Sequence, residues 1–135
     1  MGVDRLTKIS DQDLNRLKLL GWDNSKDRNL DKEHLFVFRI ENIVVGYILS
    51  SDSRSSNPHI YELYVLERYW GNREYDIGLS LLAMVLDKYR EDGCEEVSLG
   101  VENDNYRAIR FYEKHGFVLV QNYKESRMKA MMLKI

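Results

Sequence analysis

The chain has 135 residues, of which 44% are hydrophobic and 31% are charged, a composition typical of one globular domain over residues 1–135. Its formal net charge of −2 gives no general basic field, so we expect no nucleic-acid partner. The one cysteine, Cys94, excludes an internal disulfide bond and a cysteine metal cluster, and no metal site is expected. Without a long apolar run or a signal-peptide pattern, the sequence predicts a cytoplasmic protein with no membrane contact.

The first half of the chain is predicted to form a strand, a helix and three more strands. Residues 6–9 predict the first strand, and Ser10 or Asp11 then caps a helix that ends near Gly21. Residues 22–33 are polar and aperiodic, which predicts a loop or a short second helix. Apolar runs at 35–40 and 43–49 predict a hairpin with a tight two-residue turn, and residues 60–66 predict a central strand.

The second half alternates between strands and helices. Apolar residues at helical spacing from Ile77 to Tyr89 predict a helix that ends at Gly93. A strand at 96–101, a helix at 105–115 and strands at 117–123 and 128–133 follow. A strand meander followed by this alternation predicts an α/β fold with a mixed sheet flanked by helices.

Residues 105–117 carry the most specific pattern in the chain. Asn105 is a good N-cap, and Gly116 stands where the helix is expected to stop. One helix face is formed by Ala108, Phe111, Tyr112 and His115. The order of Asn, Ala, Phe-Tyr-Glu-Lys and Gly-Phe resembles the second signature motif of the GNAT superfamily of acyl-CoA-dependent N-acetyltransferases. The preceding strand ends four residues before Asn105, which is also similar to the family's spacing.

The resemblance implies a single GNAT-like acetyltransferase domain with a mostly antiparallel central sheet. It implies an enzyme that moves an acetyl group from acetyl-CoA to a primary amine by direct attack in a ternary complex. The acceptor would be a small molecule or a protein amine, and the resemblance leaves a homodimer open. Cys94 need not act as a nucleophile in this reaction, and its acidic neighbours are expected to raise the pKa of its thiol.

By resemblance, acetyl-CoA would be bound by Val65, Arg73, Ile77, Gly78, Asn105 and Tyr112. Family members typically carry Arg/Gln-x-x-Gly-x-Gly/Ala before the helix at 77–89, where backbone N–H groups bind the pyrophosphate. Residues 73–78 instead read Arg-Glu-Tyr-Asp-Ile-Gly, with Asp76 in place of the first glycine. Asp76 is also a good N-cap, with Ile77 as the first helical residue. Its carboxylate leaves open an alternative function, a non-catalytic GNAT-like binding module with a degenerate pyrophosphate loop.

Two residues are candidates for the catalytic proton transfers. Tyr112 matches the family's tyrosine that protonates the coenzyme A sulfur, and a phenol is a suitable donor to a thiolate. Glu62 is a charge within an apolar strand, where the family often has a general base. A cross-strand ion pair or a solvent-facing position would explain Glu62 equally well. His59 is a weaker candidate base, which strict alternation places on the opposite face from Glu62.

The acceptor site is expected to involve two segments that shape it in similar proteins. The first contributes Trp22, Asp23, Asp27 and Asp31, and the second is residues 123–126. Acidic groups beside an aromatic ring suit a cationic amine, although a solvated loop would show the same composition.

Overall fold

The computed structural model describes residues 2–25, 28–54, 58–71, 76–122 and 127–135, without the side chains of residues 121 and 122. Its elements in chain order are β1 (Gly2–Leu6), α1 (Asp11–Leu19), β2 (His34–Ile40), β3 (Ile43–Ser50), β4 (His59–Val65), the 3₁₀ turn η1 (Glu67–Tyr69), α2 (Ile77–Glu91), β5 (Glu96–Glu102), α3 (Tyr106–Lys114), β6 (Val118–Asn122) and β7 (Met128–Lys134). Within the described part of the chain, no helix has the length and apolar character needed to span a membrane.

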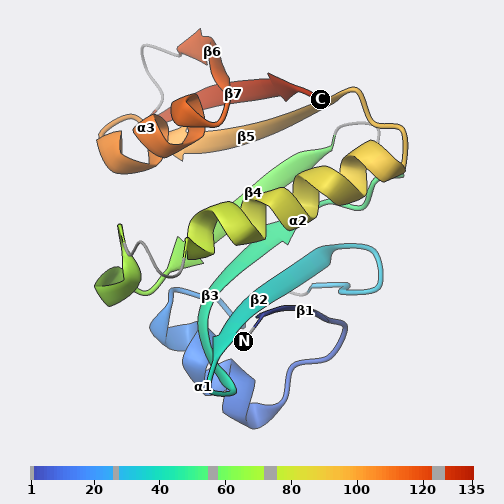
Figure 1. Cartoon of the computed structure of the whole chain (residues 1–135), viewed down its shortest axis with the longest axis vertical. Coiled ribbons are helices and arrows are strands. Elements are labelled where there is room, and N and C mark those ends of the chain that lie inside the picture. Colours follow the sequence, from blue (N-terminus) through green and yellow to red (C-terminus); the bar gives the residue numbers. More distant parts are fainter. Residues whose placement is uncertain (1, 26–27, 55–57, 72–75, 123–126) are drawn as a thin grey trace.

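The strands form one seven-stranded sheet in the order β1-β2-β3-β4-β5-β7-β6. β4 and β5 run parallel, whereas the other neighbouring pairs are antiparallel. The parallel ladder is short, because it joins His59 to Ser98 and Ile60 to Leu99 and then stops. Beyond Ile60 the two strands diverge towards the carboxyl end of β4 (Figure 1). The predicted mixed, mostly antiparallel sheet is confirmed.

The helices cover both faces of the sheet. α2 and α3 lie on one face, where their buried side chains share the larger core with those of β2 to β5 (Figure 1). α1 packs on the other face against a second core, which contains Leu17 from the helix and Tyr47 from β3. The core side chains of β2 and β3 alternate between the two clusters, which is why both strands read as continuous apolar runs.

Most of the predicted elements are found within one or two residues of their expected bounds. The tight turn between β2 and β3 is Glu41-Asn42, with φ of 51° and 66°, as a two-residue hairpin turn requires. The predicted first strand at 6–9 is wrong, because the observed strand lies over Gly2–Leu6 and pairs with β2 from Arg39 to Leu35. The position of this edge strand is set by its hydrogen bonding to the free edge of β2. The sequence around residues 2–9 contains no information about that pairing. The described residues between 22 and 33 form turns rather than a second helix.

Candidate active site

The first turn of α2 presents backbone donors at the open end of β4. Asp76 caps this helix, since its Oδ1 accepts from the Leu79 N–H at 3.4 Å and its carbonyl accepts from the Ser80 N–H at 3.0 Å. The predicted N-cap, with Ile77 as the first helical residue, is confirmed. The N–H groups of Ile77 and Gly78 have no acceptor within the helix, and donors of this kind attract anions.

Gly78 lies where the start of α2 packs against α3. A Cβ atom at Gly78 would come within 3.3 Å of the Phe111 ring and within 4.0 Å of Val65. The absence of a side chain therefore lets the end of β4, the start of α2 and the middle of α3 converge. The Ile77 side chain is buried in the core, so only its backbone is available to a ligand. Arg73, predicted to bind the same anion, lies outside the described residues.

The start of α3 is tied to the segment that follows β4. Asn105 is the N-cap as predicted, with its Oδ1 accepting from the Ala108 N–H at 3.2 Å. Two residues after Asn105, the Arg107 guanidinium lies 4.3 Å from the centre of the Trp70 ring. The Trp70 indole N–H donates to the Val65 carbonyl at 2.8 Å. This stacked pair connects the segment that follows β4 to the start of α3, which follows β5.

Tyr112 projects from α3 into the larger core. Its side chain is 7% exposed, and its ring centre lies 5.5 Å from those of Phe111 and Phe117. Burial raises the pKa of Tyr112 to about 12, with a smaller contribution from Tyr64. The phenol is therefore protonated at neutral pH and able to donate a proton.

Strand β4 contains a bulge at Tyr61. Ile60 pairs with Ser50, whereas Glu62 pairs with the preceding residue, Leu49, so one extra residue lies on β4. Such a bulge interrupts the alternation of side chains along the strand. Strict alternation counted from His59 therefore assigns each residue after Tyr61 to the wrong face of the sheet.

The bulge brings His59 and Glu62 to the same face. Glu62 lies on the α1 side, because its cross-strand partner Leu49 belongs to the core beneath α1. The His59 Nδ1 is 2.8 Å from the Ser98 Oγ, and the neighbours of Ser98 along β5 are buried on the α2 side. The prediction that His59 and Glu62 lie on opposite faces is therefore wrong. His59 is engaged with Ser98, and burial lowers the pKa of its imidazole.

Glu62 is coupled to Tyr112 through a third residue, Tyr64. Burial is the main cause of the raised pKa values of Tyr47 and Tyr64, and the charge of Glu62 is the next. Tyr64 in turn raises the pKa of Tyr112. Glu62 lies on the α1 side of the sheet and Tyr112 lies in the core shared with α2 and α3, and both interact electrostatically with Tyr64. Tyr64 was not predicted as a site residue. Its position two residues after Glu62 on β4 could have indicated it, because such residues share a face of a strand.

The residues expected to shape an acceptor site are dispersed. Trp22 is buried in the core beneath α1, and the Asp23 carboxylate accepts two hydrogen bonds within its own turn. Asp31 lines a pocket at the far end of the molecule. Asp27 and residues 123–126 lie outside the described residues.

Comparison with known sequences identifies relatives of the chain. Residues 5–117 match the acetyltransferase (GNAT) family. The chain is 30% identical over 88 residues to the mycothiol acetyltransferase of Brachybacterium faecium, a match covering 64% of this chain and 27% of that protein. It is 36% identical over 58 residues to the uncharacterized protein YdhI of Bacillus subtilis, covering 43% of this chain and 36% of that protein. The matches thus span between 27% and 36% of these two relatives.

Solved structures share the fold over almost the whole chain. PH1933 from Pyrococcus horikoshii has a TM-score of 0.79 at 23% identity, covering 98% of this chain and 97% of that one. The PaiA N-acetyltransferase of Thermoplasma acidophilum, solved in complex with coenzyme A, has a TM-score of 0.77 at 15% identity and full coverage of both chains. The fold expected from the motif at 105–117 is therefore confirmed. With a family match over residues 5–117, this chain belongs to the acetyltransferase (GNAT) family.

Proposed function

We propose that the protein transfers an acetyl group from acetyl-CoA to a primary amine by direct attack in a ternary complex. The observation that carries this proposal is the divergence of β4 from β5 beside the first turn of α2. A ligand lying in this opening would meet anion-binding backbone donors at one end and Tyr112 at the other. Family membership and the fold shared with a coenzyme A complex support the same assignment.

The residues of the site can supply both proton transfers of this reaction. Glu62 would take a proton from the acceptor ammonium, and the neutral amine would then attack the thioester carbonyl carbon. As the carbon–sulfur bond breaks, Tyr112 would donate its phenolic proton to the departing thiolate, and the excess proton on the newly acylated nitrogen would pass through water to the Tyr112 phenolate. Cys94 is not needed as a nucleophile, and burial together with Asp92 raises the pKa of its thiol.

Backbone groups around the opening are assigned to the pyrophosphate and to the thioester carbonyl of acetyl-CoA. The N–H groups of Ile77 and Gly78 would bind the pyrophosphate, and Asn105 and Val65 flank the path towards Tyr112. Backbone groups of β4 beyond Ile60 have no ladder partner on β5 in the described residues, so a β4 N–H is available to polarise the thioester carbonyl. Among the described residues at this helix terminus, the Asp76 carboxylate opposes the binding of a phosphate.

Asp76 gives a specific reason to keep a second candidate function. A carboxylate at about 5 Å from a phosphate would cost roughly 3 kcal/mol at an effective dielectric of 20. In that case the protein would be a non-catalytic binding module that retains the fold without efficient use of acetyl-CoA. The exposure of Asp76 to solvent favours the enzyme, because water screens its charge.

Thermal unfolding with and without acetyl-CoA tests the proposal without knowledge of the acceptor. A ligand at about 100 times its dissociation constant adds roughly 2.7 kcal/mol to the free energy of unfolding, which raises the melting temperature by several degrees. A shift of this size, followed by release of free coenzyme A thiol with a panel of primary amines, would support the enzyme. The absence of any shift at millimolar acetyl-CoA would instead favour the non-catalytic module.

A further inference from the structure

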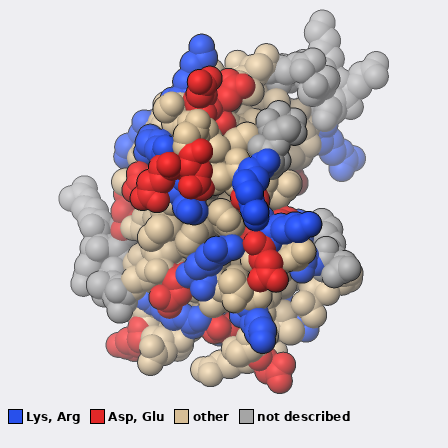
Figure 2. Space-filling model, turned by 90° about the vertical axis from the view of Figure 1, so that its right-hand side faces the viewer, with Lys and Arg blue, Asp and Glu red and all other residues tan. Residues whose placement is uncertain are grey.

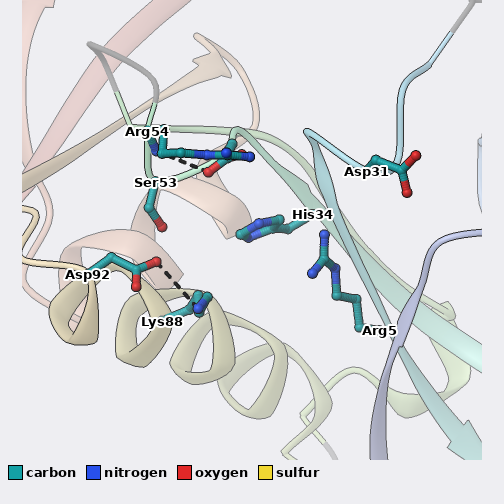
Figure 3. Close-up of a pocket in the computed structure, with 8 residues that line it drawn as sticks. Arg5, Asp31, His34, Ser53, Arg54, Lys88 and Asp92 are labelled. Carbon is teal, nitrogen blue, oxygen red and sulfur yellow. Dashed lines mark hydrogen bonds and ion pairs between the residues drawn. The ribbon is translucent and has the colours of Figure 1, made fainter.

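A second pocket lies at the end of the molecule opposite the proposed active site. Helix α2 begins beside the opening between β4 and β5, and its last turn, 15 residues on, forms one wall of this pocket. The pocket has a volume of about 450 Å³, within the range of roughly 300–1,000 Å³ that small-molecule sites occupy. Its other walls come from β1, the start of β2 and the segment after β3 (Figure 3).

Two ion pairs neutralise most of the charge that lines the pocket. The Arg54 Nε and Nη2 atoms donate to Asp52 Oδ2 at 3.0 and 2.7 Å, and this pairing lowers the pKa of Asp52 to about 2. On the last turn of α2, the Lys88 Nζ lies 3.5 Å from Asp92 Oδ2. These four side chains therefore form a polar wall with little net charge.

Two further lining residues, Arg5 and Asp31, carry opposite charges and form no ion pair within the described part of the chain. Arg5 makes a long hydrogen bond of 3.4 Å to the Leu30 carbonyl, and its guanidinium points towards His34 (Figure 3). The Asp31 carboxylate stands on the same side of the pocket, apart from Arg5 (Figure 3). A ligand that contacts both residues needs a negative group near Arg5 and a positive group near Asp31.

The inner part of the pocket supplies neutral hydrogen-bonding groups. His34 is 6% exposed, and burial together with Arg5 lowers the pKa of its imidazole, so the ring is neutral at pH 7. A neutral imidazole offers one donor and one acceptor. The Ser53 hydroxyl is buried, and its hydrogen bonding to the Asp92 carboxylate lowers the pKa of Asp92. A hydroxyl that donates to a carboxylate keeps its oxygen lone pairs, so Ser53 can still accept a hydrogen bond from a ligand.

We propose that this pocket binds a small polar α-amino acid. Arg5 binds the α-carboxylate in a two-pronged contact, and Asp31 accepts hydrogen bonds from the α-ammonium. His34 and Ser53 then contact the polar side chain of the ligand. A zwitterion fits this lining better than a single ion, because the two lining residues outside the ion pairs are one cation and one anion. Acidic and basic side chains alternate over this whole side of the molecule, so its surface favours neither sign (Figure 2).

Isothermal titration calorimetry on the full chain tests this proposal independently of any acetyltransferase activity. L-Serine, L-threonine, L-asparagine and L-aspartate are titrated separately, with acetate and ethylammonium as probes that carry one charge each. We expect at least one of the amino acids to bind, and both single-charge probes to bind at least about tenfold more weakly, since each loses one charge-assisted contact. Acetate that binds as tightly as the best amino acid would overturn the proposal in favour of a plain anion site.

Variants locate the binding site. Arg5→Gln and Asp31→Asn should each weaken the best amino acid by about tenfold or more. Arg90→Gln, which removes a charge from α2 outside the pocket, and Glu62→Gln should leave its affinity unchanged. Loss of binding in Glu62→Gln but not in Arg5→Gln would place the ligand in the proposed active site and refute this assignment. No binding of any of the four amino acids at 10 mM to the folded protein would refute it as well.

Discussion

The Tyr112 phenol owes its proposed role to its surroundings on α3. Because burial raises its pKa to about 12, the side chain keeps its proton over the pH range in which amine acceptors become neutral. It also lies within electrostatic range of Tyr64, on the part of β4 that has left β5. A donor that stays protonated beside the opening is what a departing thiolate needs.

Tyr112→Phe should lower kcat by about 100-fold, because the thiolate loses its proton donor while the ring still fills the core. The dissociation constant for acetyl-CoA, measured by calorimetry, should change by less than about twofold. Tyr106→Phe, on the exposed side of the same helix, is the matched control and should keep full activity. Unchanged turnover in Tyr112→Phe would show that another group or water protonates the sulfur.

Glu62→Gln should lower kcat/KM by roughly 100-fold at pH 7, where an aliphatic amine is protonated and needs a base. At a pH near the amine's own pKa, the loss should shrink, because a large share of the acceptor is already neutral. Steady-state rates across this range, with a correction for stability, provide the measurement. An equal loss at every pH would assign Glu62 a structural role on the sheet face.

Among the elements, α2 connects stability with cofactor binding at its first turn. The Asp76 side chain and the proposed pyrophosphate compete for the same helix terminus, although the cap bond to Leu79 is long at 3.4 Å. The Gly78–Phe111 contact keeps this terminus close to α3. Any change at Asp76 therefore acts on the cap and on the ligand together, and two variants are needed to separate them.

Asp76→Ser should tighten acetyl-CoA binding by about tenfold, since a hydroxyl keeps the N-cap and removes the negative charge. Asp76→Gly should tighten binding similarly and lower the free energy of unfolding by a few tenths of a kcal/mol. Calorimetry and thermal melts on both variants separate the two effects. Weaker binding in both variants would instead mean that the carboxylate contributes to the site.

At the scale of the whole molecule, the partly buried ion pair between Arg39 and Asp13 connects α1 to the sheet. Arg39 on β2 makes two hydrogen bonds to Asp13 on α1, at 2.8 and 2.9 Å, and a third to Asp4 on β1 at 3.0 Å. Hydrogen bonding from Arg39 lowers the pKa of Asp13. The pair therefore stabilises the fold above the pKa of a free carboxyl, about 4, and this contribution is lost as the pH falls through the lower pKa of the folded state.

Asp13→Asn should lower the free energy of unfolding by about 1–2 kcal/mol at pH 7, because a two-pronged, partly buried pair is lost. Denaturant unfolding at a series of pH values should show this difference shrinking below pH 4. Asp11→Asn is the control, since Asp11 also lies in the first turn of α1 but forms no ion pair within the described residues. A difference that persists unchanged to the lowest pH would exclude the ion pair as its cause.

The sequence by itself determined the family and most of the elements, the first strand excepted. The capping side chains of Ser10, Asp76 and Asn105 each accept from the amide three residues later, so a short stretch of sequence is enough to predict them. The motif at 105–117 is also contained in one short stretch. Apolar runs likewise indicated the hairpin and the central strand before any tertiary contact was known.

Only the tertiary structure decided how the polar groups meet. The bulge at Tyr61 depends on pairing with β3, and it places His59 and Glu62 on one face where alternation separates them. Burial of Tyr112 and its coupling to Tyr64 require α3 and β4 to approach from distant parts of the chain. The pocket at Arg5 and Asp31 joins segments that are far apart between residues 5 and 92, for the same reason. Cross-strand register and long-range packing are set by the summed contacts of the whole sheet, which no short window of sequence contains.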